Sequence, residues 1–361
     1  MIEIESLEEL DRALARAESS GRAMRDWQVQ GLDLTGREDV LLRLDPRAAL
    51  FLGCTISEPT AERLRAGGAL LFPQVPDVPF DPWRAHLYTP RELYADLDHG
   101  YQSTLDARIH AWSRRARGRH DLSDLLAKAL HDRSVEDALE EMVTGRHVVG
   151  VMGGHALERD DTAYAHAARL GQELARRGHT VATGGGPGAM EAANLGARLA
   201  DEPTARLDRV IATLATVPSF ESQVTTWART GFEAVEGLPD SGRSLGIPTW
   251  FYGHEPPNPF CSAIAKYFRN ALREEVLLQV GRAGIVFLPG AAGTVQEIFA
   301  AVCANYYAGD DVAPMVFVGE HHWNDVLPVW PLVRAMAGDR PFATTTSLVD
   351  DVTEVPDLID R

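Results

Sequence analysis

Lysine is almost missing from this chain of 361 residues. Lys128 and Lys266 are its only lysines among 35 lysine and arginine residues. A phosphate-binding P-loop requires the pattern GxxxxGK[ST], and no glycine cluster here is followed by such a lysine. Positive charge is also in short supply, because 52 acidic residues give a formal net charge of -17 and no long basic run occurs. We therefore expect no nucleic-acid partner.

Cysteine and long apolar runs are scarce as well. The three cysteines, Cys54, Cys261 and Cys303, are far apart and lack CxxC spacing, which disfavours a disulfide framework and a structural zinc site. We expect buried or half-buried thiols. No apolar run approaches the 18 residues of a membrane-spanning helix, and the acidic start "MIEIESLEEL" does not resemble a signal peptide. The sequence thus predicts a cytoplasmic protein with no membrane partner.

The remaining composition is that of a globular protein, 45% hydrophobic with 31 glycines and 21 prolines, and the length predicts two domains. Residues 1–118 contain short apolar pieces divided by glycine and proline, which predict a smaller N-terminal α/β domain. Residues 119–146 are predicted to form a helical linker. From 147 to 361, apolar strands alternate with amphipathic helices, a pattern typical of a parallel sheet with helices on both faces. The predicted strands include 147–152, 180–183, 209–216, 246–252, 283–288 and 314–319.

Three of these strands end in glycine clusters. They are the pair Gly153 and Gly154, the run 184–188, and the loop that holds Gly290 and Gly293. In open α/β sheets, ligands bind beyond the carboxyl ends of the strands. Glycine allows close approach of a ligand, and the helix start behind it offers free N–H groups to an anion. One such loop is equally a tight turn, but three together favour a crevice that binds a phosphorylated ligand.

Two sets of polar residues lie near the third glycine loop. The segment "SAIAKYFRNALREEVLLQV" predicts a helix, on which Lys266, Arg269 and Arg273 share one face. This face is either an anion clamp or a solvated surface. Glu297 follows Thr294 by three residues, so it is either a capping partner at the helix start or a carboxylate aimed into the crevice. In the second case it can stabilise positive charge at an anomeric carbon or activate a water.

The segment "GIPTWFYGHEPPNPF" adds an aromatic and histidine-containing loop. One of the aromatic residues Trp250, Phe251 and Tyr252 can stack on a base there, and His254 can meet a phosphate or a leaving base. The alternative is a proline-rigid loop packed on the core. Further along the chain, His321 and His322 are expected in a solvated turn.

Two stretches carry a family resemblance: "GGGPGAMEAANLGA" at 184–197 and "PGAAGTVQE" at 289–297. They resemble the two signatures of the LOG family, formerly often labelled lysine decarboxylases. That family includes cytokinin riboside monophosphate phosphoribohydrolases and bacterial nucleotide 5′-monophosphate nucleosidases. The resemblance covers about residues 146 to 355. Two positions depart from the second signature, since Ala291 replaces a glycine and Gln296 precedes the glutamate.

The resemblance implies a Rossmann-like fold and hydrolysis of the N-glycosidic bond of a nucleoside 5′-monophosphate, yielding a free base and ribose 5-phosphate. It places the essential glutamate on Glu297 and the essential arginine on Arg273, with Arg269 as the alternative. It also implies a homo-oligomer, and neither a cofactor nor a metal is expected. The implied phosphate-binding residues are Gly290, Ala291, Ala292, Gly293 and Thr294. The implied nucleotide-binding residues are Gly153, Gly154, Gly184, Gly185, Gly186, Gly188, Met190, Arg269 and His254.

Other functions stay open. A non-catalytic nucleotide sensor, or a carrier of a phosphorylated cofactor such as molybdenum cofactor, needs the glycine loops but no glutamate–arginine pair. A scaffold that acts through its N-terminal domain is a third hypothesis. A pyridoxal phosphate decarboxylase is disfavoured, because its Schiff base needs a lysine and neither glycine motif contains one.

Overall fold

The computed structural model describes residues 2–20, 23–117, 121–221, 223–251 and 255–361, which group into two compact units. One unit comprises Met1–Leu87 and Trp112–Leu139, and the other comprises Tyr88–Ala111 and Glu140–Arg361. This grouping differs from the predicted division at 118 and 147. The physical reason is visible at Asp106, which forms a buried ion pair of 2.7 Å with Lys266 and so fixes its segment to the C-terminal unit.

The first unit contains a four-stranded parallel sheet in the order β1-β2-β3-β4. Its core is built from the middle strands, where Val29 and Phe51 are buried, and from Leu10 and Leu64 of two covering helices. Leucines three and four residues apart give the first of these helices one apolar face. The predicted N-terminal α/β fold is therefore confirmed. The strands are β1 Ile2–Ile4, β2 Trp27–Gln30, β3 Leu50–Leu52 and β4 Leu70–Phe72, and the helices are α1 Leu7–Ser20, α2 Glu38–Leu41 and α3 Glu58–Ala66.

The second unit contains a seven-stranded parallel sheet in the order β11-β10-β9-β5-β6-β7-β8. The chain enters at β5, builds β6, β7 and β8 on one side, and then returns to build β9, β10 and β11 on the other. The strand order therefore reverses between β5 and β9, which is the switch point where such sheets bind ligands. The strands are β5 Val148–Met152, β6 Thr180–Thr183, β7 Ser244–Gly246, β8 Ala263–Ile264, β9 Gly284–Phe287, β10 Met315–Val318 and β11 Thr346–Val349.

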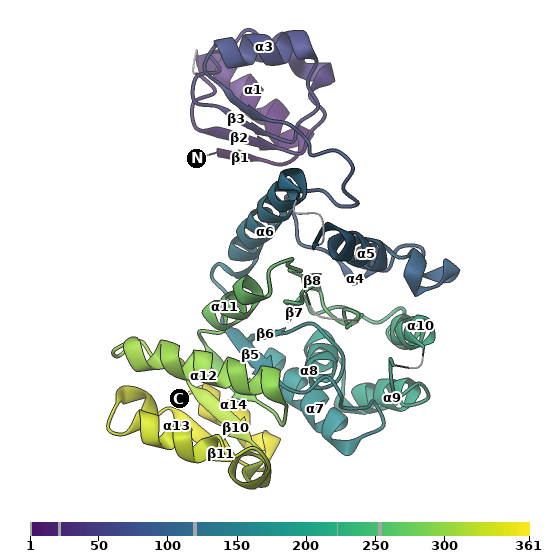
Figure 1. The fold of residues 1–361 in the computed structure, drawn as a ribbon, viewed down its shortest axis with the longest axis vertical. Helices are drawn as coiled ribbons and strands as arrows, with labels where there is room; N and C mark the ends of the chain where they lie inside the picture. Colours follow the sequence, from purple (N-terminus) through teal and green to yellow (C-terminus); the bar gives the residue numbers. More distant parts are fainter. Residues whose placement is uncertain (1, 21–22, 118–120, 222, 252–254) are drawn as a thin grey trace. The chain divides into compact units, whose positions relative to one another are not determined.

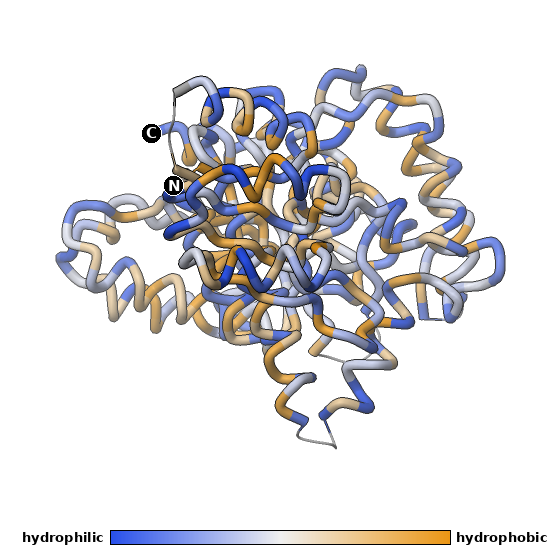
Figure 2. The backbone as a smooth tube through the Cα atoms, turned by 90° about the horizontal axis from the view of Figure 1, so that it is seen from above, coloured by the Kyte–Doolittle hydropathy of each residue, from blue (hydrophilic) through white to orange (hydrophobic). Residues whose placement is uncertain are grey.

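Helices cover both faces of this sheet, so the predicted α/β fold class is confirmed (Figure 1). On one face α7 packs against α8 and α14, and on the other α11 contacts α12, which in turn contacts α13. Hydrophilic and hydrophobic residues alternate along the helical turns in Figure 2, as expected for helices with one buried face. The helices outside the first sheet are α4 Pro90–Leu93, α5 Leu105–Arg117, α6 Leu122–Val143, α7 Thr162–Arg176, α8 Ala189–Arg198, α9 Thr204–Leu214, α10 Val224–Ala234, α11 Asn270–Val280, α12 Ala292–Tyr307, α13 Trp330–Ala337 and α14 Val355–Ile359.

Some local predictions were wrong. The apolar segment 209–216, predicted as a strand, lies largely in α9, because Leu207, Val210 and Leu214 recur at helical spacing and are the buried residues. The strand predicted at 246–252 instead ends at Gly246. Cys303 is exposed rather than buried. Among the described residues, no helix has the length and apolar character needed to cross a membrane.

Candidate functional site

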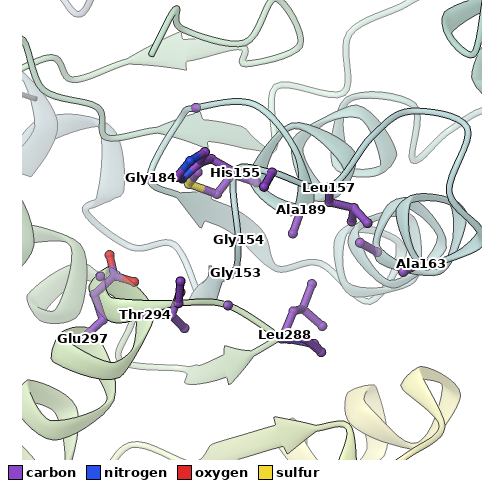
Figure 3. A pocket seen from close by; sticks show the side chains of 18 of the residues that line it. Gly153, Gly154, His155, Leu157, Ala163, Gly184, Ala189, Leu288, Thr294 and Glu297 are labelled. Carbon is purple, nitrogen blue, oxygen red and sulfur yellow. The ribbon is translucent and has the colours of Figure 1, made fainter. Parts of the chain in front are cut away.

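A cavity of about 810 Å³ lies at the switch point of the large sheet. It is lined by the loops that follow β5, β6 and β9, which carry Gly153, Gly184 and Gly290 respectively. Figure 3 shows these loops around one hollow, with Thr294 and Glu297 on its α12 side. Its volume is within the range of small-molecule sites. The three predicted glycine loops therefore meet at one cavity.

The start of α12 supplies an anion-binding geometry to this cavity. Ala291 is the N-cap residue, and its side chain provides no cap for the N–H groups of the first turn. The exposed residues Ala292 and Gly293 lie in that turn, which contains no acidic side chain. Free N–H groups and the positive end of the helix dipole favour an anion at this position. Ala291 has φ -119° and ψ -150°, an extended conformation open to any residue, so its departure from glycine leaves the loop undistorted.

The loop before α12 is held from two sides. A Cβ atom on Gly290 would lie 2.1 Å from Oγ1 of Thr294, so only glycine allows the loop to close on its own helix. His322, just after β10, places Nε2 3.1 Å from the carbonyl oxygen of Gly290 and lines the cavity. The expectation of a solvated turn holds for His321, whose side chain is 82% exposed, but is wrong for His322. The position of His322 a few residues after an apolar strand is the sequence signal that places it at the cavity.

Arg273 of α11 and Glu297 of α12 form an ion pair that lines the cavity. Nη1 of Arg273 donates to Oε1 of Glu297 at 3.0 Å, and Nε donates to the carbonyl of Ile247 at 2.7 Å. Only 12% and 11% of the two side chains are exposed. Burial raises the pKa of the Glu297 carboxyl, and the charge of Arg273 opposes that rise. A Cβ atom on Gly184 would lie 2.1 Å from Nη2 of Arg273, so glycine is needed there for the guanidinium to fit.

The predicted basic stripe does not form. Helix α11 begins only at Asn270, with Arg269 as its extended N-cap residue, so Lys266 and Arg269 do not share a helical face with Arg273. Lys266 is buried and paired with Asp106, which removes the cost of an isolated buried charge. Of the described residues, Arg273 lines the cavity whereas Arg269 does not. The geometry thus distinguishes Arg273 from its alternative.

Trp250 is also placed differently from the stacking hypothesis. It is 2% exposed, and its indole N–H donates to Asp106 at 2.8 Å. The alternative of a loop packed on the core holds for this residue. His254 lies outside the described residues.

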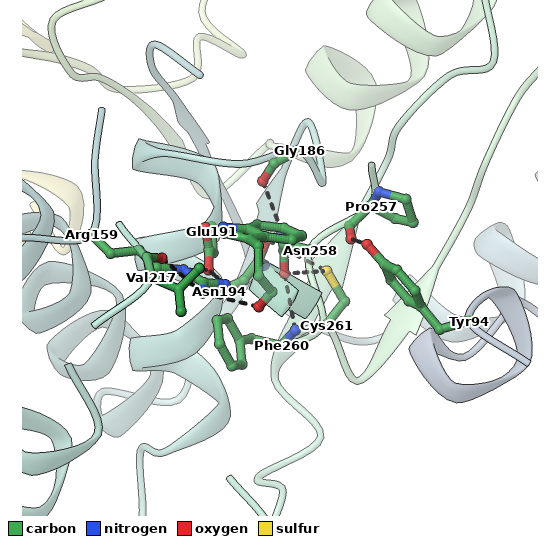
Figure 4. Close-up of polar contacts among 11 residues, drawn as sticks. Tyr94, Arg159, Gly186, Glu191, Asn194, Val217, Pro257, Asn258, Phe260 and Cys261 are labelled. Carbon is green, nitrogen blue, oxygen red and sulfur yellow. Dashed lines mark hydrogen bonds and ion pairs between the residues drawn. The ribbon is translucent and has the colours of Figure 1, made fainter. Parts of the chain in front are cut away.

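Behind the second glycine loop, buried amides fix the backbone (Figure 4). The Asn258 side chain donates to the carbonyl of Gly186 at 3.2 Å and to Oδ1 of Asn194 at 3.0 Å. Its backbone N–H donates to the carbonyl of Gly185 at 2.9 Å. These asparagines were not singled out in the sequence, because nothing local links residues so far apart in the chain. The two asparagines hold a loop that lines the cavity, but they do not line the cavity themselves.

The start of α8, next to this loop, differs from the start of α12 in charge. Its first turn contains Glu191, whose buried carboxylate accepts from Nε of Arg159 at 2.8 Å. Gly188 is the N-cap residue of this helix and has φ 74°. An anion at this helix start would meet a negative side chain already in place. Phosphate is therefore favoured at α12 over α8.

Most of the implied site residues surround the cavity, and two lie behind it. Gly185 and Gly188 belong to the supporting layer of the second loop. Among the described residues, no group of three or more His, Cys, Asp or Glu side chains is arranged to hold a metal ion. The implied residues that line the cavity are Gly153, Gly154, Gly184, Gly186, Met190, Arg273, Gly290, Ala291, Ala292, Gly293, Thr294 and Glu297.

Parts of this chain are similar to known proteins. Residues 146–204 match the model of the SLOG cluster4 family. Over 214 residues the chain is 25% identical to the pyrimidine/purine nucleotide 5′-monophosphate nucleosidase of Escherichia coli strain K12, and equally to those of strains O6:H1 and O157:H7. The aligned region covers 58% of this chain and only 39% of each relative.

Among solved structures, the molybdenum cofactor binding protein from the phototrophic bacterium Rippkaea orientalis is similar at a TM-score of 0.37 and 18% identity. The match covers 60% of this chain and 96% of that chain. The family model matches the part of the chain that carries the first two glycine loops. The resemblance to the LOG family, within the wider SLOG group, is thereby confirmed for this region.

Proposed function

We propose that this chain hydrolyses the N-glycosidic bond of a nucleoside 5′-monophosphate, releasing a free base and ribose 5-phosphate. The observation that carries the proposal is the Arg273–Glu297 pair, at 3.0 Å, in the same cavity as the uncapped start of α12. The phosphate binds the N–H groups of that first turn, and the ribose lies beside Glu297. The activity by which the curated relatives are named, nucleotide 5′-monophosphate nucleosidase, supports the same substrate class.

The pair suits the charge changes of this reaction. As the bond between C1′ and the base nitrogen breaks, its electron pair stays on the base and positive charge develops on the ribose ring. The carboxylate of Glu297 stabilises that charge and accepts a proton from the water whose oxygen bonds to C1′. Burial raises the pKa of Glu297, which makes it a stronger base than an exposed glutamate. Arg273, anchored on the carbonyl of Ile247, fixes the carboxylate in position.

The test is a substrate panel of AMP, GMP, CMP, UMP and IMP, with ribose 5-phosphate and free base measured by chromatography. Glu297→Gln is expected to lower kcat by about 10²–10⁴-fold on any accepted substrate. The matched control is Glu275→Gln, which removes an exposed carboxylate of α11 that accepts from Gln279 and lies outside the cavity lining. Absence of ribose 5-phosphate from all five nucleotides would overturn the proposal.

The panel also separates hydrolysis from binding alone. Calorimetry with the same nucleotides measures affinity, and chromatography of the recovered ligand reports whether it is intact. A nucleotide that binds and stays intact for hours identifies a non-catalytic binder.

A further inference from the structure

A second acid–base pair lines the same cavity. Nδ1 of His155 lies 3.4 Å from Oε1 of Glu255, and both residues are part of the cavity lining. His155 directly follows the glycine pair at the end of β5. Glu255 comes from the loop between β7 and β8, so the two side chains converge from separate segments.

The second glycine loop connects this pair to Arg273 and Glu297. At one end of the loop, Gly184 lies against the guanidinium of Arg273. At the other end, a Cβ atom on Gly186 would lie 3.6 Å from Oε2 of Glu255. Figure 3 labels His155, Gly184 and Glu297 among the residues that line the cavity, with Glu297 on the α12 side. A nucleotide whose ribose lies beside Glu297 can therefore extend its base along the loop towards His155.

The reaction needs a proton donor at that end. A purine or pyrimidine that leaves with the electron pair of the broken bond departs as an anion unless a proton reaches it. Four other ionisable side chains of the lining have partners elsewhere: Glu297 with Arg273, Glu274 with Asn270 and Gln296, His322 with Gly290, and Asp350 with the backbone N–H of Glu320. His166 of α7 also lines the cavity.

We propose that His155, held by Glu255, protonates the leaving base; this inference rests on the proposed function. The imidazolium proton moves to the base nitrogen as the bond to C1′ breaks, and the electron pair of that bond remains on the base. The oxygen of water bonds to C1′, and its proton goes to Glu297. Solvent then returns a proton to His155 and takes one from Glu297, so the net reaction consumes one water.

Several carboxylates lie around His155. Glu255 faces it across the cavity at 3.4 Å. The smaller cavity on its other side, of about 220 Å³, is lined by Glu158 of its own loop, Glu191 of α8 and Glu221 of the 218–221 segment. Arg159, the cation nearest to that group, is paired with Glu191.

The decisive experiment compares two leaving groups on the full-length protein. AMP needs a proton on its base, whereas 4-nitrophenyl β-D-ribofuranoside 5-phosphate releases a stable anion without one. His155→Gln is expected to lower kcat on AMP by about 10²–10⁴-fold and to leave kcat on the nitrophenyl substrate unchanged. His321→Gln, at an exposed histidine outside the cavity, is the matched control and keeps both rates. Circular dichroism confirms that each variant is folded.

A second variant tests the role of the carboxylate. Glu255→Gln removes the carboxylate that holds the His155 imidazole, so kcat on AMP is expected to fall while kcat on the nitrophenyl substrate stays unchanged. Equal loss on both substrates in His155→Gln, or no loss on AMP, overturns the inference while the proposed function stands. The inference is also overturned if His166→Gln, at a histidine of α7 that lines the cavity, loses activity on AMP and keeps it on the nitrophenyl substrate. If the wild-type protein cleaves neither substrate, the proposed function fails and this inference fails with it.

Discussion

Arg273 and Glu297 meet across two different helices, with Nη1 of one 3.0 Å from Oε1 of the other and about nine-tenths of each side chain buried. Arg273 is not held by the pair alone, because it also donates to the carbonyl of Ile247 just beyond β7. The guanidinium thus links the β7 end of the sheet to α12. This double anchoring leads to the first prediction.

Arg273→Lys keeps the charge but loses the planar fork that reaches two acceptors at once. We expect kcat to fall by about 10²-fold, as for loss of one preorganised donor, with a smaller effect on KM. Steady-state kinetics on the best nucleotide of the panel measures this. Arg282→Lys is the control, because that exposed arginine pairs with Asp311 away from the cavity. A lysine variant as active as wild type would show that the second anchor is irrelevant.

The pH dependence should respond to the neighbours of Glu297. Burial is the main cause of its raised pKa, and the negative charge of Glu274 adds to the rise. Glu297 acts as a base, so its protonation produces the acid limb of the kcat profile. Removing the neighbouring charge in Glu274→Gln lowers the pKa of Glu297, and the acid limb should therefore move to lower pH. A limb that stays in place or moves up would contradict the assignment of Glu297 as the base.

Stability should depend strongly on Arg159. Its guanidinium and the Glu191 carboxylate are each 1% exposed, and it also donates to the carbonyl of Trp227 at 3.0 Å (Figure 4). Arg159→Met leaves Glu191 buried without its partner and is expected to cost about 3–5 kcal/mol of unfolding free energy. Adding Glu191→Leu should recover part of that loss. Denaturant unfolding measures both, with Arg169→Met, at an exposed ion pair with Asp208, as control.

The small sheet carries its own pH sensitivity. Burial, assisted by nearby carboxylates that include Glu3 and Glu9, raises the pKa of Glu5 to about 7. A folded-state pKa above the unfolded value means that stability is fully present below about pH 4.5 and is lost as pH rises through 7. Glu5→Gln should therefore raise the Tm of this unit at pH 8 and change it little at pH 4.5. Glu62→Gln, at an exposed position of α3, should change neither.

The sequence predicted the parts of the site that depend on local pattern. Apolar strands followed at once by glycine are a short-range signal, and the loops at 153–154, 184–188 and 290–293 all reach the cavity region as expected. Segment 209–216 failed because an apolar run fits a buried helix as well as a strand. The helix predicted from 262 began late because the residues before Asn270 pair with the sheet edge instead.

What the sequence did not reveal is the set of long-range polar partners. Arg159 meets a glutamate 32 residues away, and Asn258 meets an asparagine 64 residues away. His155 and Glu255 converge from separate loops. A single sequence contains no local signature for such pairs, since they arise only when the sheet brings its strand ends together. The sequence predicted that the glycine loops lie at one cavity. It did not predict which side chains hold those loops or place charges beside them.

The buried pair of Asp106 and Lys266 has a consequence for how this protein can be divided. Its two units are interleaved along the chain, and the segment that carries Asp106 precedes Trp112–Leu139 of the other unit. A shortened chain that begins after residue 118 keeps the lining of the cavity but leaves Lys266 as a buried ammonium without its counterion. The large sheet is therefore not a module that a single gene truncation can release, and an exchange of the N-terminal region between proteins must retain Tyr88–Ala111 with the C-terminal part.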